Sequence, residues 1–398
     1  MKHNATDNLQ FPKESTVIRR TLIVGVVFLL MTLVGYVFDS KQFYFSYLTS
    51  FAFYTGLGII SLFFVMLQHI TRSSWSVVMR RIPEVISSNI FIWSLFVIPV
   101  ILGAHDLYHW THAELFDPAN PEYDALLASK QGYLNMPFFI IRQVVYFAIW
   151  GFLGWRVYKN SVAIETTGDW GYDTAQRKVS APGILLFSLT CAFAAFDWLM
   201  SLDPHWFSTM FGVYYFAMNF QAFFPAMILM TMYLHKKGML TNTIGIAHLN
   251  DMGKLTFGFT VFYAYIAFSQ FFLIYYANIP EETLWFYHRM EGSWIYVMYS
   301  LLIARFIIPF IVLLPMNSKR NLSVLRFMSI WILVMHFIEL YWVVMPTLHH
   351  DGVVFNWMDV TAFIGMGGIF LYLFFSRFSK QAMIPVNDPK LAESLNKH

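Results

Sequence analysis

Long apolar runs alternate with short polar stretches along most of this 398-residue chain. Ten of the runs have about 20 predominantly apolar residues or more, the length that an α-helix needs to cross the hydrocarbon core of a bilayer. They lie at 18–38, 44–69, 86–104, 136–157, 181–201, 209–234, 255–278, 292–315, 324–346 and 358–377. The pattern therefore predicts ten transmembrane helices, with both chain ends on the same side of the membrane.

Polar segments bound this apolar region at both ends. Residues 1–16 are predicted to be a polar segment on the cytoplasmic side, and 17–380 a single membrane domain with about ten spans. The polar tail over 381–398 is predicted to be disordered. The outer loop 105–135 is too long for a simple turn, whereas the loops on the terminal side are short apart from 159–180. We therefore expect no catalytic domain outside the membrane.

The basic residues fix the predicted orientation. Of the 26 Lys and Arg residues, 21 fall on the side of the termini. The opposite loops hold only Lys41, Lys130 and Arg289, together with many acidic residues, and Arg142 and Arg305 lie inside apolar runs. By the positive-inside rule both termini are predicted to be cytoplasmic.

Composition supports the membrane assignment. The chain is 58% hydrophobic and only 12% charged, with a mean hydropathy of +0.54, whereas soluble domains contain about 25% charged residues. The net charge of +3 is small, and no nucleic-acid partner is expected. The sequence predicts an all-α integral membrane protein.

Cysteine and histidine usage argues against a metal-based redox centre. The single cysteine, Cys191, excludes an intrachain disulfide, a CxxCH haem attachment and a Cys-ligated iron–sulfur cluster. A transmembrane haem b needs facing histidines inside the membrane, and only His336 lies at mid-depth of a predicted span. We therefore expect this chain to bind no cofactor of its own.

The most polar stretch within the membrane domain joins the fifth and sixth runs in the segment FDWLMSLDPHWFSTMFGVYYF at 196–216. Asp197 lies about one turn inside its helix, where an ionisable group is costly and usually functional. Pro204 and the flanking tryptophans equally fit a plain interfacial turn. Arg142, under two turns inside the fourth run, can snorkel outward. We favour a pair between Arg142 and Asp197, which would keep the carboxylate ionised.

The segment HDLYHWTH at the outer end of the third run is a second candidate. Spacings of four and three residues would place His105, His109 and His112 on one helical face. That face could bind a metal, with Asp106 orienting a ring, or exchange protons near neutral pH. It is also typical of an amphipathic helix end at the interface. Without a fourth ligand, no metal site is predicted.

Three charged or titratable residues form the third candidate. His336 and Glu339 share one face of the ninth run, and Arg305 lies near mid-depth of the eighth, within one or two helical turns of them in depth. Burial of these groups together is costly unless they pair or line a wet cavity. A structural clamp, a proton relay and a polar ligand site all fit this pattern. Gln221, Asn219, Ser269 and Gln270 would extend such a path, and they equally fit hydrogen-bond contacts between helices.

Three of these segments together resemble a known family. The string at 196–216, with NMPFFIIRQVVYFAIW at 135–150 and the HDLYHWTH element, is similar to the large membrane subunits of alternative complex III. That complex is a bacterial quinol:cytochrome c (or oxidase) oxidoreductase, and these subunits belong to the NrfD/polysulfide-reductase-like superfamily. The resemblance covers roughly 20–380. The compact length and the histidine element resemble ActF more than its sister subunit ActC.

The resemblance implies two four-helix bundles plus two flanking helices in the bacterial inner membrane. It implies as partners the sister NrfD-like membrane subunit, multihaem and monohaem cytochrome c subunits, an iron–sulfur subunit and a terminal oxidase. Haem c and the iron–sulfur clusters would belong to these partners. Quinol, as menaquinol or ubiquinol, would be oxidised on the outer side at the membrane subunit that contacts the iron–sulfur subunit. Asp197, Arg142, His105, Asp106 and His109 match the motif residues of the family.

The predicted function is that of a membrane subunit of a respiratory quinol-oxidising electron-transfer complex, a scaffold and proton path that is not catalytic alone. One alternative is the quinol-binding subunit of the same complex, and another a purely structural subunit. A secondary transporter fits less well, because Pro99, Pro225 and Pro309 show no matched pattern in two halves. The candidate residues for a proton path or polar site are Asp197, Arg142, His105, Asp106, His109, Arg305, His336 and Glu339.

Overall fold

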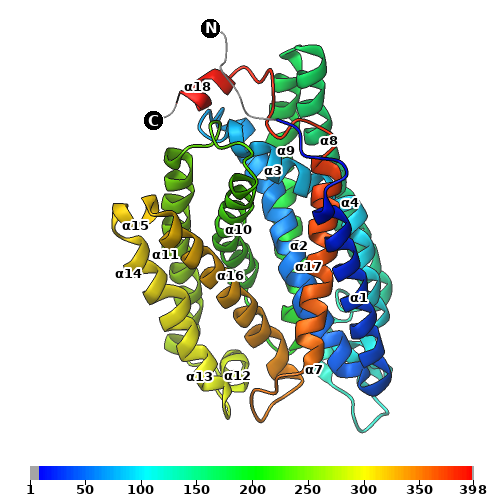
Figure 1. Cartoon of the computed structure of the whole chain (residues 1–398). Helices are drawn as coiled ribbons and strands as arrows, with labels where there is room; N and C mark the ends of the chain where they lie inside the picture. Colours follow the sequence, from blue (N-terminus) through cyan, green and yellow to red (C-terminus); the bar gives the residue numbers. More distant parts are fainter. Residues whose placement is uncertain (1–8, 397–398) are drawn as a thin grey trace.

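The structure is a computed structural model that describes residues 9–396 (Figure 1). Over this range it has ten helical spans long and apolar enough to cross a membrane, so the predicted all-α, multi-pass membrane fold is confirmed. The spans are α1 (Thr16–Phe38), α2 (Ser40–Ile70), α3 to α5 (Val77–Ser88, Ile90–Trp93 and Ile98–Leu102, with η1 Ser94–Val97), α8 (Met136–Thr167), α9 (Gly171–Trp198), α10 (Met210–Lys236), α11 (Ile246–Ala277), α13, η5 and α14 (Trp294–Ser300, Leu301–Ile307 and Ile308–Leu313), α16 (Leu322–Val344) and α17 (Trp357–Phe378).

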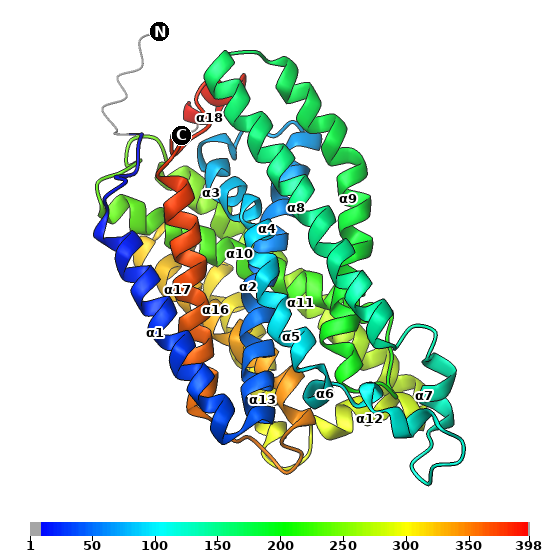
Figure 2. The ribbon, with the colours of Figure 1, turned by 90° about the vertical axis from the view of Figure 1, so that its right-hand side faces the viewer.

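Short helices fill the connections between the spans. They are α6 (Ala104–Leu107), η2 (His109–Thr111), η3 (Ala113–Phe116), α7 (Ala125–Lys130), η4 (Met200–Leu202), α12 (Pro280–His288), α15 (Met316–Arg320), η6 (Met345–Thr347) and α18 (Leu391–Leu395). The helix α18 and the chain leading into α1 lie at one end of the molecule, which we call the terminal face (Figure 1). The helices α7 and α12 lie at the other end, the opposite face (Figure 2).

The spans form two groups of four with a flanking pair. Helices α2, α3, α8 and α9 pack on one another in the first bundle, and α10, α11, α14 and α16 in the second. The two bundles meet where α2 and α9 contact α10 and where α2 contacts α16. Helix α2 is central, with 89% of its most apolar window buried, against 17% for α1. Both bundles therefore pack around α2, whereas α1 lies at the edge of the molecule.

Glycines allow the flanking helices α1 and α17 to approach closely, side by side in Figures 1 and 2. A Cβ added at Gly368 would lie 2.5 Å from the backbone of Gly25, and one added at Gly25 would lie 2.7 Å from the backbone nitrogen of Ile369. Small residues at a helix–helix contact bring backbones within van der Waals range, which drives association in lipid. This contact attaches α1 to the rest of the fold.

Helices α3, α8 and α9 begin or end well outside the predicted limits. Helix α3 starts at Val77 rather than near 86, because Arg80 and Glu84, which a hydropathy pattern excludes, are buried in an ion pair. The predicted loop 159–180 is wrong: α8 continues to Thr167 and α9 begins at Gly171, so most of it is a helical hairpin. Gly168 closes α8 in the left-handed region at φ 70°. Charged residues can continue a helix beyond the membrane. A prediction from hydropathy alone ends the helix where the apolar run ends.

The predicted disorder of 381–398 is wrong for the described part of that tail. Asp388 forms a buried ion pair with Arg80, and the Ser394 hydroxyl accepts a hydrogen bond from the backbone of Val78. The tail also contacts the N-terminal segment, because the backbone N–H of Met383 donates to the Leu9 carbonyl at 2.7 Å. The polar composition suggested a solvated tail, but its polar side chains find partners on the terminal face. Residues 1–8 of the predicted polar segment 1–16, and 397–398, lie outside the described range.

Candidate functional site

A cluster of buried charged and polar side chains lies inside the second bundle. His336 and Glu339 lie one turn apart on α16, and each contacts Arg305 of the preceding span. All three are at most 1% exposed. The predicted meeting of these three residues is therefore confirmed. Because water cannot solvate a group buried so deeply, each must find partners within the protein.

Arg305 is held on a π-helical segment, the seven residues of η5. Single π turns inside α-helices are rare and occur often at functional sites. The Arg305 Nη1 donates to the Met335 carbonyl at 3.1 Å and forms an ion pair with Glu339, and Nη2 donates to the Met218 carbonyl at 3.2 Å. The guanidinium also lies 4.4 Å from the ring centroid of Tyr263. These contacts from three spans hold the cation in one orientation.

His336 is placed between a fixed donor and a fixed acceptor. Arg305 Nη2 lies 3.1 Å from His336 Nδ1, and His336 Nε2 lies 3.1 Å from the Asn219 Oδ1. Asn219 in turn donates its amide N–H to the Tyr215 carbonyl at 2.8 Å, which orients its oxygen toward the histidine. Since Arg305 can only donate, these partners fit a neutral imidazole with its proton on Nε2. A neutral imidazole in this place therefore accepts a hydrogen bond at one ring nitrogen and donates one at the other.

The Glu339 carboxylate accepts hydrogen bonds from two tyrosines of neighbouring spans. The Tyr263 hydroxyl donates to Oε1 at 2.7 Å, and the Tyr214 hydroxyl donates to the same oxygen. The other oxygen, Oε2, faces Arg305. A carboxylate that receives a cation and two hydroxyl donors has partners at both of its oxygens, which a polar group removed from water requires. The cluster therefore holds one titratable acid beside one titratable imidazole.

A cavity of about 480 Å³ adjoins this carboxylate. Its wall includes Glu339, Tyr214 and Tyr263 on one side and the aromatic residues Phe271 and Trp285 on another. Ligand pockets typically measure about 300–1,000 Å³ and are lined mainly by apolar groups with a few polar ones. The Glu339 cluster therefore adjoins a space large enough for a small organic molecule.

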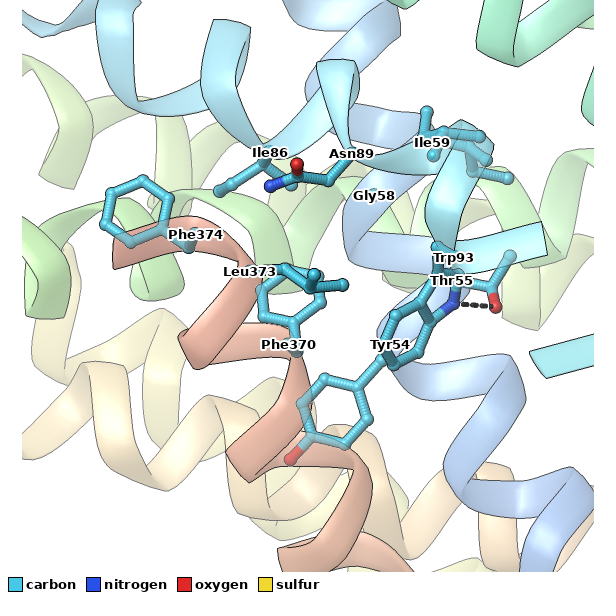
Figure 3. A pocket seen from close by; sticks show the side chains of 11 residues that line it. Tyr54, Thr55, Gly58, Ile59, Ile86, Asn89, Trp93, Phe370, Leu373 and Phe374 are labelled. Carbon is cyan, nitrogen blue, oxygen red and sulfur yellow. Dashed lines mark hydrogen bonds between the residues drawn. The ribbon is translucent and has the colours of Figure 1, made fainter. Parts of the chain in front are cut away.

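A second, much smaller cavity lies between α2, the α3–α4 region and α17 (Figure 3). It measures about 10 Å³, room for no more than one water molecule. The indole N–H of Trp93 beside it already donates to the Thr55 hydroxyl at 2.9 Å (Figure 3). This space is a packing gap between helices rather than a ligand site.

The predicted pair of Arg142 and Asp197 forms in the first bundle. Arg142 Nε lies 2.8 Å from Asp197 Oδ2, and Nη2 lies 2.9 Å from Oδ1, so the contact is bidentate. Asp197 also accepts hydrogen bonds at 2.9 Å from the hydroxyls of Tyr133 and Tyr146. Asp197 is 1% exposed. Bidentate pairs between arginine and carboxylate are among the stronger ion pairs because both N–H donors are aligned.

The predicted histidine face on one helix is wrong. Helix α6 ends at Leu107, Tyr108 is extended, and His109 begins a separate 3₁₀ turn. The chain folds back, so the His105 and His112 rings stack with centroids 4.2 Å apart and His112 Nε2 lies 3.0 Å from the His105 carbonyl. Asp106 makes no hydrogen bond to these rings in the described part of the chain, so it does not orient them as predicted.

The surroundings of His109 oppose a positive charge. Partial burial lowers the pKa of His109, and the neighbouring His112 and His205 lower it further. His109 is therefore neutral at pH 7, with its titration moved below the usual value of 6.5. Among the described residues no three His, Cys, Asp or Glu side chains are arranged to hold a metal ion.

The turn in the segment 196–216 is attached to the outer loop. His205 Nε2 lies 2.5 Å from Asp124 Oδ2, and Lys130 Nζ donates to the Pro204 carbonyl at 2.7 Å. His288 of α12 approaches Asp203 at 3.3 Å. These contacts join the opposite face of both bundles, which matches the interfacial-turn interpretation for the turn residues. Asp197 itself lies deeper, with the arginine.

The sequence reasoning missed the four tyrosines that donate to the two buried carboxylates. Tyr146 lies one helical turn after Arg142, and this spacing was a usable signal. Tyr133, Tyr214 and Tyr263 come from other elements, and nothing in a chain with 22 tyrosines distinguishes them.

Compared with protein-family models and with curated proteins, the chain matches none of them.

Proposed function

We propose that this chain is a membrane subunit of a bacterial respiratory complex that oxidises quinol, and that the Glu339 cluster is part of its proton path. The haem c and iron–sulfur centres of that complex belong to partner subunits: the sister membrane subunit, the cytochrome c subunits, an iron–sulfur subunit and a terminal oxidase. The termini lie in the cytoplasm in this proposal, which the excess of basic residues near the terminal face supports.

One observation carries the proton-path proposal: a run of side-chain contacts leads from Glu339 toward the terminal face. Arg305, paired with Glu339, donates from Nε to Gln221 Oε1 at 3.2 Å. The Gln221 amide donates to the Thr260 hydroxyl at 3.1 Å, and Thr260 donates to the Thr256 carbonyl at 2.8 Å. Buried polar groups in a membrane domain are costly and mark ion or proton pathways.

The chemistry assigns each member of the cluster a task. Glu339 and His336 both contact Arg305, so a proton gained by one changes the field at the other. Arg305 stays charged and provides a fixed countercharge. Tyr214 and Tyr263 orient the carboxylate by donating to it. Proton exchange at Glu339 thus changes the charge at a single place in the second bundle.

The first test asks whether the chain belongs to such a complex. The full chain is tagged in its host, solubilised gently, and the visible spectrum of what co-purifies is recorded. Since this chain has no CxxCH motif, a c-type haem spectrum with bands that quinol reduces must come from partners and supports the proposal. A colourless, isolated membrane protein would contradict it.

The second test measures proton movement in liposomes that contain the purified complex. We expect Glu339→Gln to reduce the rate of proton movement during quinol oxidation by about 10²-fold, the usual scale for loss of a proton-transferring group. The matched control is Glu281→Gln, the same change at an exposed carboxylate of α12. Normal quinol oxidation with unchanged proton movement in Glu339→Gln would overturn the relay.

A further inference from the structure

A polar cavity belongs to the terminal face, where α18 and the hairpin of α8 and α9 lie (Figure 2). It measures about 290 Å³, just below the range of about 300–1,000 Å³ that is usual for pockets that hold drug-sized molecules. Its wall is formed by the end of α2 with the turn after it, by one face of the first two turns of α9, and by the tail residues before α18. Three segments far apart in the sequence therefore enclose a space that suits a small ligand.

Basic side chains outnumber acidic ones on this wall by four to two. Both acids are already paired with two of the basic side chains: Asp173 lies 3.4 Å from Arg177, and Asp388 forms an ion pair with Arg80. The wall therefore has an excess of positive charge, which the other two basic side chains provide.

These two side chains are Arg72, in the turn after α2, and Lys390, in the tail. The Lys390 Nζ donates a hydrogen bond to the Arg72 carbonyl, so the two residues lie next to each other. Within residues 9–396 neither side chain forms an ion pair. Two neighbouring cations without a counterion favour a negative charge in the space between them.

The same wall holds two polar atoms without partners. His69 is 2% exposed, and among the described residues its Nε2 atom has no hydrogen-bond partner. The Ser73 hydroxyl, four residues later, has none either in that part of the chain. A buried polar atom without a partner costs free energy and requires an explanation. Both atoms can donate a hydrogen bond, so an acceptor inside the cavity would satisfy them.

Arg72 stands where the backbone favours glycine. Its φ is 52°, in the left-handed region. The backbone N–H groups of Arg72 and Ser73 donate to the carbonyls of His69 and Gln68 at 3.3 Å and 3.1 Å, the pattern in which a left-handed residue, usually glycine, ends a helix. Because arginine is strained in this conformation and glycine is not, the turn itself gives no reason for an arginine. A role of the side chain in the cavity gives one.

We propose that this cavity binds a phosphate group, which belongs either to the headgroup of an anionic lipid or to a soluble phosphorylated compound. The negative charge of the phosphate balances the excess positive charge of the wall, and its oxygens accept hydrogen bonds from Arg72 and Lys390. The same oxygens give His69 and Ser73 the acceptor that they lack. The inference does not rest on the proposed function, because the cavity is built from α2, α9 and the tail rather than from the Glu339 cluster.

Other small ligands fit this wall less well. A metal ion or an amine would be repelled by the unpaired Arg72 and Lys390. A neutral polar molecule can bond to His69 and Ser73 but leaves the positive charge unbalanced. A carboxylate carries the right charge but has only two oxygens for donors on two separate segments, whereas a phosphate group has at least three oxygens for them.

The test uses the full chain in dodecyl maltoside, an uncharged detergent without phosphate. One arm adds phosphatidylglycerol and counts the retained lipid molecules by native mass spectrometry; the other measures binding of ³²P-labelled inorganic phosphate by equilibrium dialysis. We expect binding in at least one arm. Arg72→Gln should weaken that binding by about tenfold, as expected for loss of a hydrogen bond between charged groups. The matched control is Arg320→Gln, the same change at an exposed arginine of α15 that does not line the cavity, and it should bind like the unmodified chain.

A second variant separates binding from stability. Arg72→Gly removes the side chain but suits the left-handed backbone, so the unfolding temperature should not fall, whereas binding should fall as in Arg72→Gln. Retention of phosphatidylglycerol alone identifies a lipid headgroup as the ligand, and binding of inorganic phosphate alone identifies a soluble compound. No binding in either arm, or equal binding by the unmodified chain and both Arg72 variants, would overturn the site.

Discussion

The two buried carboxylates, Asp197 and Glu339, lie in two sites built from nearly the same parts. Each carboxylate pairs with an arginine of the preceding span in its own bundle, Arg142 or Arg305. Each also accepts hydrogen bonds from two tyrosine hydroxyls. In both bundles the arginine lies on the third span and the acid on the fourth. The two halves of the molecule therefore repeat one arrangement of charges.

Depth and surroundings separate the two sites. Arg142 lies six residues after the start of α8, about 9 Å from that helix end at 1.5 Å per residue, whereas Arg305 lies eleven residues after the start of α13, about 17 Å. The guanidinium of Arg142 is covered by the Tyr133 ring at 3.9 Å. A hollow of about 230 Å³ near the Asp197 site is lined by Tyr133 but not by Asp197. Glu339, by contrast, borders the larger cavity and shares its arginine with His336.

This difference shows what gives a buried ion pair a function. The Asp197 site satisfies its carboxylate with an arginine, two hydroxyls and the Gln143 amide at 3.3 Å, and within residues 9–396 no second carboxylate or imidazole contacts it. Such a site connects helices and fixes the turn that follows. The Glu339 site adds an imidazole, a π-helical segment and a space for a ligand. We therefore expect the first site to contribute stability and the second to contribute proton movement.

The largest expected effect comes from breaking each ion pair at the arginine. Arg305→Leu leaves Glu339 buried without its countercharge, which costs about 3–5 kcal/mol. Arg142→Leu is expected to cost less, about 1–3 kcal/mol, because Asp197 keeps three other donors, Tyr133, Tyr146 and Gln143, whereas Glu339 keeps two. Thermal unfolding of the purified chain in mild detergent measures both losses. The comparison fails if Arg142→Leu is as destabilising as Arg305→Leu.

Two controls show that the loss comes from the unpaired acid. Arg326→Leu makes the same change at an exposed arginine of α16 and should leave the unfolding temperature unchanged. The double variant Arg305→Leu/Glu339→Leu removes both charges and should recover much of the stability, since an apolar pair replaces a buried ion pair at little cost. No recovery in the double variant would mean that Arg305 stabilises the fold through its carbonyl contacts instead.

The sequence could predict the features that depend on hydropathy and on the depth of a residue in the membrane. The spans and the pairing of Arg142 with Asp197 are local matters of hydropathy and depth, and both are confirmed. The meeting of Arg305 with His336 and Glu339 likewise followed from equal depth. These predictions succeed because the position of a residue along a transmembrane helix fixes its depth in the bilayer, and side chains that pair must lie at similar depth.

The failures concern features that depend on contacts between distant segments. The order of 381–396 depends on partners such as Arg80, more than 300 residues earlier. The cavity is lined in part by Leu301, Leu302 and Phe306 of η5, and the sequence does not indicate the π-helical geometry of that segment. The prediction that His105, His109 and His112 share one helical face failed for a local reason. Tyr108 is extended between α6 and η2, so the helical spacing does not apply.

A smaller effect is expected from the tyrosines, and it sharpens the comparison. Tyr146→Phe and Tyr263→Phe each remove one hydroxyl that donates to a carboxylate, at 2.9 Å and 2.7 Å. Each should cost about 1.5–3 kcal/mol of stability, the usual value for a hydrogen bond to a charged group. Only Tyr263→Phe should also reduce proton movement in liposomes. The control is Tyr265→Phe on the exposed side of α11, and equal proton movement in all three variants would contradict distinct roles for the two sites.

The smallest expected effect tests the outer loop that covers the Asp197 site. Burial alone would raise the pKa of Asp124, but the backbone N–H of Leu127 and the His205 ring outweigh it and hold this pKa below its ordinary value of 3.8. A carboxyl group with a lowered folded-state pKa stabilises the fold while it is ionised. This contribution should be full above about pH 5 and lost as the pH falls below about 4.

Hydrogen exchange of the α7 amides across this pH range measures the effect of Asp124. Asp124→Asn keeps the N-cap, because Asn caps helices as well as Asp, and removes only the charge. It should cost no more than about 1 kcal/mol, as exposed ion pairs contribute little, and it should abolish the change below pH 4. Asp124→Ala also removes the cap and should cost about 1 kcal/mol more. If Asp124→Asn loosened α7 as much as Asp124→Ala, the cap rather than the charge would hold this loop, and the ion pair with His205 would contribute nothing to the site beneath it.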